Sequence, residues 1–365
     1  MEHPENDKAY KGLKVNDGVE KLDTINPYLS TMKRRKATLL SADEYVDGIL
    51  RGDVTVLSRA VTLIESTSPR HTQLAQEVVE RCLPYSGNSL RIGITGVPGA
   101  GKSTSIDAFG IHVLKHKGGK LAVLAVDPSS ERSKGSILGD KTRMEQLAQQ
   151  PDAFIRPSAS AGSLGGVARK TRETIILCEA AGYDTIFVET VGVGQSETAV
   201  YSMVDFFLLI QIAGAGDELQ GIKRGIMEMA DGIVINKADG NNIDEANRAA
   251  AHYRNALQLF PMPPSGIRPQ VLTYSGFYAL GIKEVWNMIY SHLAATKKNG
   301  FFDVRRQQQA KYWMYETINE QLRSRFYNSG GMEALLMEYE QQLLEGRMTS
   351  FAAAAKLLDI FDSRK

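Results

Sequence analysis

The run from Gly96 to Ser103, GVPGAGKS, constrains the fold of this 365-residue chain more than any other feature. It fits the pattern G-x-x-x-x-G-K-[ST], in which glycines allow backbone N–H groups to surround phosphate oxygens that a Cβ would obstruct. In this pattern the lysine brings a cation to the β- and γ-phosphates, and the serine hydroxyl can bind Mg²⁺. The phosphate-binding residues expected on this basis are Gly96, Val97, Pro98, Gly99, Ala100, Gly101, Lys102, Ser103 and Thr104.

The segments on either side of this loop support the interpretation. Residues Leu90–Thr95 form an apolar run typical of a buried strand, and residues Ser103–Lys117 have the pattern of a helix. The phosphates would then lie at a helix N-terminus, where unpaired N–H groups and the helix dipole favour anions. The alternative is a glycine-rich turn that matches the pattern by chance. The strand–loop–helix order favours a protein that binds a nucleoside triphosphate.

Strands and helices alternate from about residue 88 to residue 293. The strand candidates are mostly short, continuous apolar runs, as a sheet covered on both faces requires. We therefore expect an α/β fold, a three-layer P-loop NTPase domain with a mainly parallel sheet. The expected strands are Leu90–Thr95, Leu121–Val126, Ala153–Arg156, Thr185–Glu189, Phe206–Ile212, Gly232–Asn236 and Gln270–Tyr274. The main helices expected between them are Gly165–Ala181, Leu219–Ala230, Asp244–Phe260 and Ile282–Leu293.

Helical patterns flank this central region on both sides. Ser41 and Glu44 have capping-box spacing, and Asp53 can cap a second helix, so a helical extension is expected before the sheet. Beyond about residue 297 the pattern is helical only, with apolar stripes too few for an independent core, so these helices must pack on the main domain or on a second subunit. We therefore expect three parts. Residues 1–87 form a helical extension that begins with about 30 loosely ordered residues, residues 88–296 form the nucleotide-binding domain, and residues 297–365 form a helical arm.

Composition excludes several classes of protein. The net charge of +1 gives no overall positive field for nonspecific binding of nucleic acid. No stretch of 18 consecutive apolar residues is present, so no membrane-spanning helix is expected. The first residues, MEHPEND, contain no apolar signal core and are too acidic for a transit peptide, so a cytoplasmic protein is expected. The two cysteines form no C-x-x-C pair, which argues against a zinc site or a structural disulfide.

The sequence Asn236-Lys237-Ala238-Asp239 indicates which base is bound. It follows an apolar strand, and a carboxylate at Asp239 can accept hydrogen bonds from N1–H and the 2-amino group of guanine. Adenine has neither donor there, so the carboxylate would stay unsatisfied. Taken alone, the motif could equally be a capped turn, but its place after several strands favours GTP over ATP. Ser275 and Gly276, after the last strand, are expected to contact the base, although a helix-entry turn explains them equally well.

Three acidic residues follow strands and could serve a Mg²⁺ shell. Glu189 ends the strand 185–189, where most P-loop proteins have an aspartate that holds this shell, and a glutamate can act through a water. Gln195 lies in the segment after it, whose glycines suit a loop near the γ-phosphate. Asp127 and Asp140 follow the second strand, and their carboxylates could bind Mg²⁺ or orient a water molecule. From spacing alone they could equally be solvated acidic residues of a loop.

A third glycine-containing loop, residues 213–223, follows the strand 206–212 and opens a helix. Its glycines permit movement. Judged from the residue types alone, its charged residues are exposed charges at a helix start. These residues are Asp217, Glu218 and Lys223.

These segments together resemble one family of P-loop GTPases. The segments are GVPGAGKST, AVDPSSERSKGSILGDKTRM, RPSASAGSLGGVARKTRE, VETVGVGQSE, QIAGAGDELQGIKRG and NKADG. That family has a glutamate in place of aspartate in its third G motif, here Glu189. Within it, the chain is similar to the methylmalonyl-CoA-mutase-associated GTPases of the MeaB and MMAA type, over roughly residues 35–365.

The resemblance implies a GTP-hydrolysing G-protein chaperone of an adenosylcobalamin-dependent acyl-CoA mutase, with methylmalonyl-CoA mutase as the default partner. Such proteins gate cofactor loading, protect the mutase from inactivation and help remove damaged cofactor. This chain would bind GTP or GDP and Mg²⁺, and it would meet adenosylcobalamin only through the mutase. The resemblance also implies a homodimer held largely by the C-terminal arm.

The resemblance also assigns roles by position. Asp127 and Asp140 would belong to switch I, with Asp140 near Mg²⁺, while Glu189 would begin switch II. Lys102, Asp127, Asp140 and Glu189 are thus the catalytic candidates, and Ser103, Asp127, Asp140 and Glu189 the metal-binding ones. The loop with Asp217, Glu218 and Lys223 would be a switch III that relays nucleotide state, and Gln195 is a further switch or partner candidate.

Three other functions remain open on the sequence. A nickel or other metal-insertion GTPase of the same family typically carries a His-rich tract or paired cysteines, and this chain has neither. A small-molecule kinase or transport ATPase is disfavoured by the aspartate of NKAD. A binding module with slow turnover also fits, because no glutamine or arginine is securely placed as a catalytic finger.

Overall fold

The computed structural model describes residues 39–66, 68–126, 143–157, 164–190, 196–214 and 224–363. Contacts group Ser41–Lys365 in one compact unit, and Met1–Leu40 are grouped apart from it. Of the latter, only Leu39 and Leu40 are described, and they have no regular structure. No helix in the described ranges combines the length and the apolar character needed to cross a membrane.

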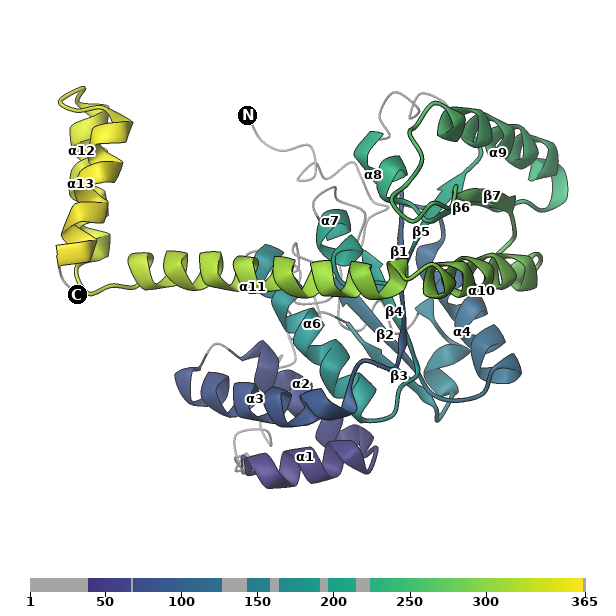
Figure 1. Ribbon diagram of the computed structural model, residues 1–365, viewed down its shortest axis with the longest axis horizontal. Coiled ribbons are helices and arrows are strands. Elements are labelled where there is room, and N and C mark those ends of the chain that lie inside the picture. The colour runs from purple at the N-terminus through teal and green to yellow at the C-terminus, as the bar shows by residue number, and fades with distance from the viewer. Residues whose placement is uncertain are drawn as a thin grey trace, which may run out of the picture. The chain divides into compact units, whose positions relative to one another are not determined.

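Seven parallel strands form the central sheet (Figure 1). Their order is β3-β2-β4-β1-β5-β6-β7, so β1 lies in the middle with β4 and β5 on its two sides. Every strand that the sequence predicts is present, with ends within one residue of the expected ones. The strands are β1 (Leu90–Gly96), β2 (Leu121–Val126), β3 (Ala153–Arg156), β4 (Thr185–Thr190), β5 (Phe206–Ile212), β6 (Gly232–Asn236) and β7 (Gln270–Thr273).

Helices cover both faces of the sheet, which explains why the strands are continuous apolar runs. One face packs on α4 (Lys102–His116) and α10 (Ile282–Lys298). The helices that contact strands from the opposite side are α6 (Leu164–Ala180), α7 (Ser196–Tyr201), α8 (Arg224–Met229) and α9 (Ile243–Gln258). The expected α/β fold with a parallel, three-layer core is therefore confirmed. Short 3₁₀ turns lie at Leu83–Tyr85, Leu147–Gln149 and Gly240–Asn242.

Three helices precede the sheet and all contact α6. They are α1 (Ala42–Leu50), α2 (Val54–Glu65) and α3 (Pro69–Cys82). The two N-caps expected from the sequence are present. Ser41 and Glu44 form a reciprocal capping box, and the Asp53 carboxylate accepts the backbone N–H groups of Thr55 and Val56. The sequence limits 1–87, 88–296 and 297–365 remain predictions, because the contacts place no boundary at residue 87 or residue 296.

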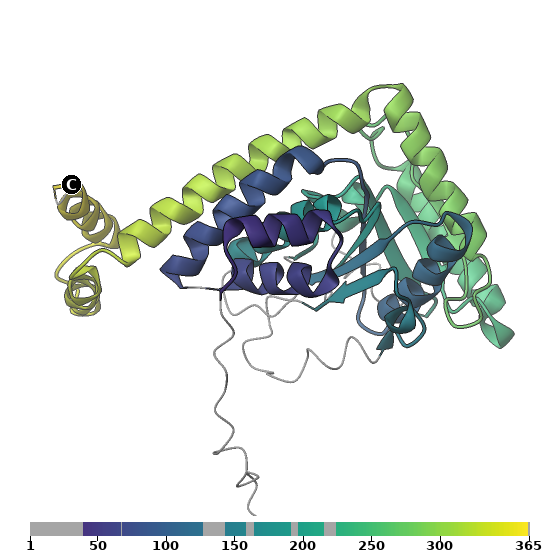
Figure 2. The ribbon, with the colours of Figure 1, turned by 90° about the horizontal axis from the view of Figure 1, so that it is seen from below.

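The C-terminal arm consists of α11 (Phe301–Tyr327), α12 (Met332–Leu344) and α13 (Ser350–Ser363). Figure 2 shows α11 passing α3 and continuing to α12. Its outer half carries an apolar stripe that stays exposed in this chain, with Tyr315 61%, Ile318 45% and Leu322 53% accessible. The segment is therefore helical as expected, and the described chain covers only about half of each of these three residues.

Buried ion pairs fix the first turns of α11 to the amino-terminal edge of the sheet. Arg306 pairs with Asp205, which precedes β5, at 2.7 Å, and the Asp205 side chain is 1% exposed. Arg305 pairs at 2.8 Å with Asp231, which precedes β6. The arginine of each pair belongs to the arm and the aspartate to the amino-terminal edge of the sheet, so these contacts join the arm to the strands directly.

Candidate nucleotide site

The loop between β1 and α4 has a backbone that requires glycine at three positions. A Cβ at Gly96 would lie 2.2 Å from the carbonyl oxygen of Ile210 on the neighbouring strand. Gly99 and Gly101 have φ angles of 77° and 83°, in the left-handed region that side chains rarely adopt. The first and last of these glycines thus let the loop pass close to β5 and turn into α4.

Lys102 keeps its ammonium group inside this loop. Its Nζ donates to the carbonyl oxygens of Gly96 at 2.9 Å and Val97 at 3.4 Å. Burial lowers the pKa of Lys102 below its ordinary value, and nearby Glu189 opposes that effect. The ammonium therefore lies where the loop and the α4 N-terminus converge, an arrangement suited to an anion.

Ser103 and Glu189 bring two oxygen donors together beside the loop. The Ser103 hydroxyl donates to Glu189 Oε1 at 3.3 Å, and the Glu189 residue is 8% exposed. Glu189 is held by register, because it pairs with Ile94 of β1 and Ala125 of β2. A hydroxyl and a carboxylate are the donors that Mg²⁺ prefers, so this pair fits that ion chemically.

Asn236, at the end of β6, connects three loops of the site. Its side-chain amide donates to the Ala100 carbonyl at 2.7 Å, while its Oδ1 accepts the backbone N–H of Gly276 at 2.9 Å. Oδ1 also accepts from the N–H of Lys237 at 2.7 Å. Lys237 itself has a φ of 60°, a costly conformation that this bonding supports. One buried amide thus fixes the positions of the phosphate loop, the loop that begins at Lys237 and the loop that contains Gly276 relative to one another. The last two are the candidate base loops.

Asp239 is oriented by the loop after β7. The Ser275 hydroxyl donates to Asp239 Oδ2 at 2.6 Å, and Ser275 Oγ accepts the backbone N–H of Tyr278 at 3.2 Å. Ser275 is fully buried, so its position is fixed by packing. The two candidate base loops therefore meet through one short hydrogen bond.

Two residues that sequence reasoning missed complete this end of the site. The hydroxyls of Ser105 and Tyr274 lie 2.6 Å apart, and Ser105 also donates to the Gly101 carbonyl at 2.8 Å. A Cβ on Gly276 would lie 3.1 Å from Ser105 Oγ. Burial raises the pKa of Tyr274, which keeps its phenol protonated. No motif signals either residue; only the position of Ser105 in the first turn of α4 could have drawn attention to it.

The candidate site residues that the structure describes lie at the carboxyl ends of β1, β4, β6 and β7. This is the edge at which open α/β sheets bind ligands. The structure brings Lys102 and Ser103 close to Glu189, and Asp239 close to Ser275. The remaining candidates lie outside the described residues: Asp127, Asp140, Gln195, Asp217, Glu218 and Lys223.

Comparisons with known proteins give a consistent picture. The family model described as methylmalonyl-CoA mutase-associated GTPase MeaB matches residues 57–330. The GTPase ArgK of Escherichia coli K12 is 46% identical over 82% of this chain and 90% of its own length. A mouse protein described as methylmalonic aciduria type A homolog, mitochondrial, is 43% identical over 88% of this chain and 80% of its own.

A solved structure agrees with these matches. The crystal structure of an LAO/AO transport system kinase has a TM-score of 0.70 and 36% sequence identity, and the match covers 89% of this chain and 100% of that one. The family match spans the phosphate loop, Glu189 and Asp239. The chain therefore belongs to the family of methylmalonyl-CoA mutase-associated GTPases, and it is a GTPase.

Proposed function

We propose that this GTPase serves an acyl-CoA mutase that uses adenosylcobalamin, with methylmalonyl-CoA mutase as the first candidate. It would gate cofactor loading, protect the mutase and support its reactivation. The observation that carries this proposal is the family match over residues 57–330, which includes most of α2, all of α3, the whole sheet and α11. The mouse relative, described as a methylmalonic aciduria type A homolog, supports the same assignment.

Guanine nucleotides would occupy the cradle formed by residues 96–104. Lys102 would pair with the β- and γ-phosphates, since its ammonium already lies among the loop carbonyls. Asp239 would accept the N1–H and 2-amino donors of guanine, with Ser275 holding the carboxylate in place. Asn236 and Gly276 would keep the base loops at the right distance from the phosphate loop.

Mg²⁺ would be held at the γ-phosphate side. Ser103 and Glu189 supply a hydroxyl and a carboxylate there, and Asp127 and Asp140 are the further acids that we assign to this shell. Bound Mg²⁺ would neutralise charge on the phosphate oxygens during hydrolysis. The carboxylate of Glu189 would help to order the attacking water, because it lies beside the phosphate loop, 3.3 Å from the Ser103 hydroxyl.

Nucleotide state would reach the mutase through loops after β4 and β5. We assign Gln195 to the first loop and Asp217, Glu218 and Lys223 to the second. Such a loop must have two arrangements with different affinity for the partner, and a coupling of about 1–3 kcal/mol is typical. Charged residues suit this task because they can change partners when the γ-phosphate is lost.

We also propose a homodimer that uses the C-terminal arm. The exposed stripe on α11, Tyr315, Ile318 and Leu322, supports this, because apolar side chains at helical spacing favour burial against another chain. Met337, on α12, is also exposed, at 62%.

The decisive experiment measures GTP hydrolysis by the purified chain alone, with methylmalonyl-CoA mutase, and with an isobutyryl-CoA-type mutase. We expect one mutase to stimulate hydrolysis and to bind more tightly in one nucleotide state than in the other. In Asp217→Ala and Lys223→Ala, the fold stimulation should fall more than the rate without mutase. Equal rates with and without every mutase, and no complex by sedimentation, would contradict the proposal.

A further inference from the structure

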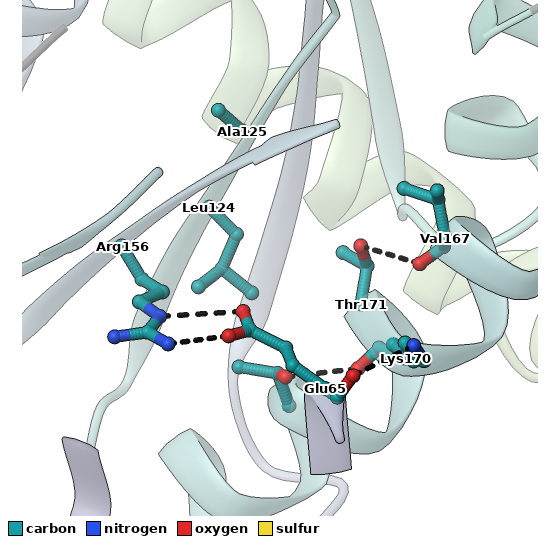
Figure 3. Close-up of a pocket in the computed structure, with 8 residues that line it drawn as sticks. Glu65, Leu124, Ala125, Arg156, Val167, Lys170 and Thr171 are labelled. Atoms are coloured by element: carbon teal, nitrogen blue, oxygen red, sulfur yellow. Dashed lines mark hydrogen bonds and ion pairs between the residues drawn. The ribbon is translucent and has the colours of Figure 1, made fainter. Parts of the chain in front are cut away.

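Glu65, the last residue of α2, contacts two elements of the GTPase domain at once. Figure 3 shows its side chain facing Arg156 of β3 and its backbone facing Lys170 of α6. These contacts belong to the helical extension, which no part of the nucleotide site described above includes. They therefore need an explanation of their own.

The side chain of Glu65 forms a two-pronged ion pair with Arg156. Arg156 Nε donates to Oε1 at 3.3 Å, and Nη2 donates to Oε2 in a short contact. Nη2 also donates to the Thr62 hydroxyl, one turn earlier on α2, at 3.1 Å. The side chains of Arg156 and Glu65 are only 21% and 15% exposed, so water screens this pair weakly.

The backbone of Glu65 holds α6. The Lys170 ammonium donates to the Glu65 carbonyl oxygen at 2.9 Å. That carbonyl belongs to the last turn of α2, where carbonyl groups have no partner within the helix and the dipole favours a cation. One residue of the extension thus fixes the end of β3 through its side chain and α6 through its backbone.

Among the residues that the structure describes, those lining the space between these contacts offer little else that could bridge the elements. A small cavity of about 20 Å³ is lined by Glu65, Arg156 and Lys170, together with Leu124 of β2 and other α6 residues. Among these α6 residues, Thr171 and Thr174 bond back to carbonyls of their own helix. Their hydroxyls therefore do not connect α6 to β3.

Strand register relates this junction to the catalytic edge. Arg156 is paired with Leu124 of β2, and Leu124 is paired with Val188 of β4. The next residue along β4 is Glu189, which receives the Ser103 hydroxyl. A shift at the end of β3 would therefore pass through two rows of backbone hydrogen bonds to the carboxylate beside the phosphate loop.

We propose that Glu65 is a positioning residue for GTP hydrolysis. It acts through Arg156 and Lys170, which hold the β3–β2–β4 side of the sheet and α6 in register at the γ-phosphate side. The phosphate loop joins β1 to α4, Asn236 ends β6 and Asp239 follows it, so these parts of the site take no share in the contacts of Glu65. Loss of the junction should therefore lower kcat, while the affinity for GDP stays close to that of the wild type.

The test compares Glu65→Ala and Arg156→Ala with the wild-type chain in Mg²⁺ and GTP. We expect kcat to fall about five- to tenfold, because a displacement well under 1 Å at a reacting group has effects of this order. The KM for GTP and the Kd for GDP should change less than kcat. The charge-reversed double variant Glu65→Arg/Arg156→Glu should regain a large part of kcat when assayed well below its melting temperature.

A matched control lies within the same extension. Asp43 of α1 pairs with Arg81 of α3 at 2.7 Å, so this ion pair joins two helices of the extension to each other. Asp43→Ala should leave kcat unchanged. Normal kcat in both alanine variants would overturn the proposal, as would loss of GDP affinity in parallel with kcat. Equal loss of kcat in Asp43→Ala, or no recovery in a folded double variant, would also overturn it.

Discussion

Guanine selectivity can be tested at a single carboxylate. An ionised carboxylate offers about four lone-pair positions. Ser275 donates to Asp239 Oδ2 at 2.6 Å, which uses one of them and fixes the orientation of the group. The remaining positions can accept N1–H and the 2-amino group of guanine. Asp239→Asn replaces one acceptor oxygen by an NH₂ group, which cannot accept either donor.

The expected cost follows from the bonds that are lost. Two hydrogen bonds to a charged acceptor are replaced by mismatched contacts, which should cost roughly 2–4 kcal/mol. This corresponds to a roughly 30- to 700-fold weaker binding of GDP. Xanthine has a carbonyl oxygen at C2 where guanine has the amino group, so the new NH₂ group can donate to it. Xanthosine diphosphate should therefore bind the variant more tightly than GDP does.

Calorimetry with GDP, xanthosine diphosphate and ADP measures this directly on the wild-type chain and on Asp239→Asn. Ser275→Ala is the matched control, because it removes the orienting hydroxyl but keeps the carboxylate. This variant should bind GDP more weakly without any gain for the xanthine nucleotide. Equal affinity of the wild-type chain for ADP and GDP would refute the reasoning, as would an Asp239→Asn variant with unchanged preference.

Three further predictions concern catalysis, stability and assembly. Glu189→Gln should lower kcat for GTP more than it lowers GDP affinity, because its charge acts mainly in the transition state; equal losses in both would remove it from the catalytic residues. Arg306→Ala should lower the free energy of unfolding, measured by urea denaturation, by roughly 3–5 kcal/mol, because it leaves the buried carboxylate of Asp205 with one partner fewer. A loss below about 1 kcal/mol would show that water replaces the arginine. Ile318→Asp with Leu322→Asp, on the exposed stripe of α11, should give a monomer by sedimentation while the wild-type chain is a dimer; a monomeric wild type would contradict the proposed assembly.

Local patterns in the sequence predicted the elements well, because the signals that start and end them lie within a few residues. Ser41 and Asp53 cap helices as expected, through partners two or three positions away. The strand at residues 206–212 was predicted to the residue, since a parallel sheet buried on both faces demands an unbroken apolar run. The phosphate loop was equally accessible, because its glycines, lysine and serine are adjacent in the chain.

The contacts that the sequence did not reveal join residues far apart in the chain. Ser105 meets Tyr274 across 169 positions, Arg156 meets Glu65 across 91, and Arg306 meets Asp205 across 101. No periodicity or short motif relates such pairs; they come together only when the sheet order is fixed. This is also why the charged residues in these pairs gave no sign in the sequence that they would be buried.

The ion pairs between α11 and the sheet have a consequence for the order of folding. Asp205 and Asp231 stand at the entrances to β5 and β6, so they become neighbours only after these strands have paired. Arg305 and Arg306 come later in the chain and meet both carboxylates within one turn of helix. A chain with β5 and β6 out of register would offer these two arginines no correctly spaced acceptors. Docking of α11 would then fail, and only molecules with a completed sheet would place the arm correctly for the proposed homodimer.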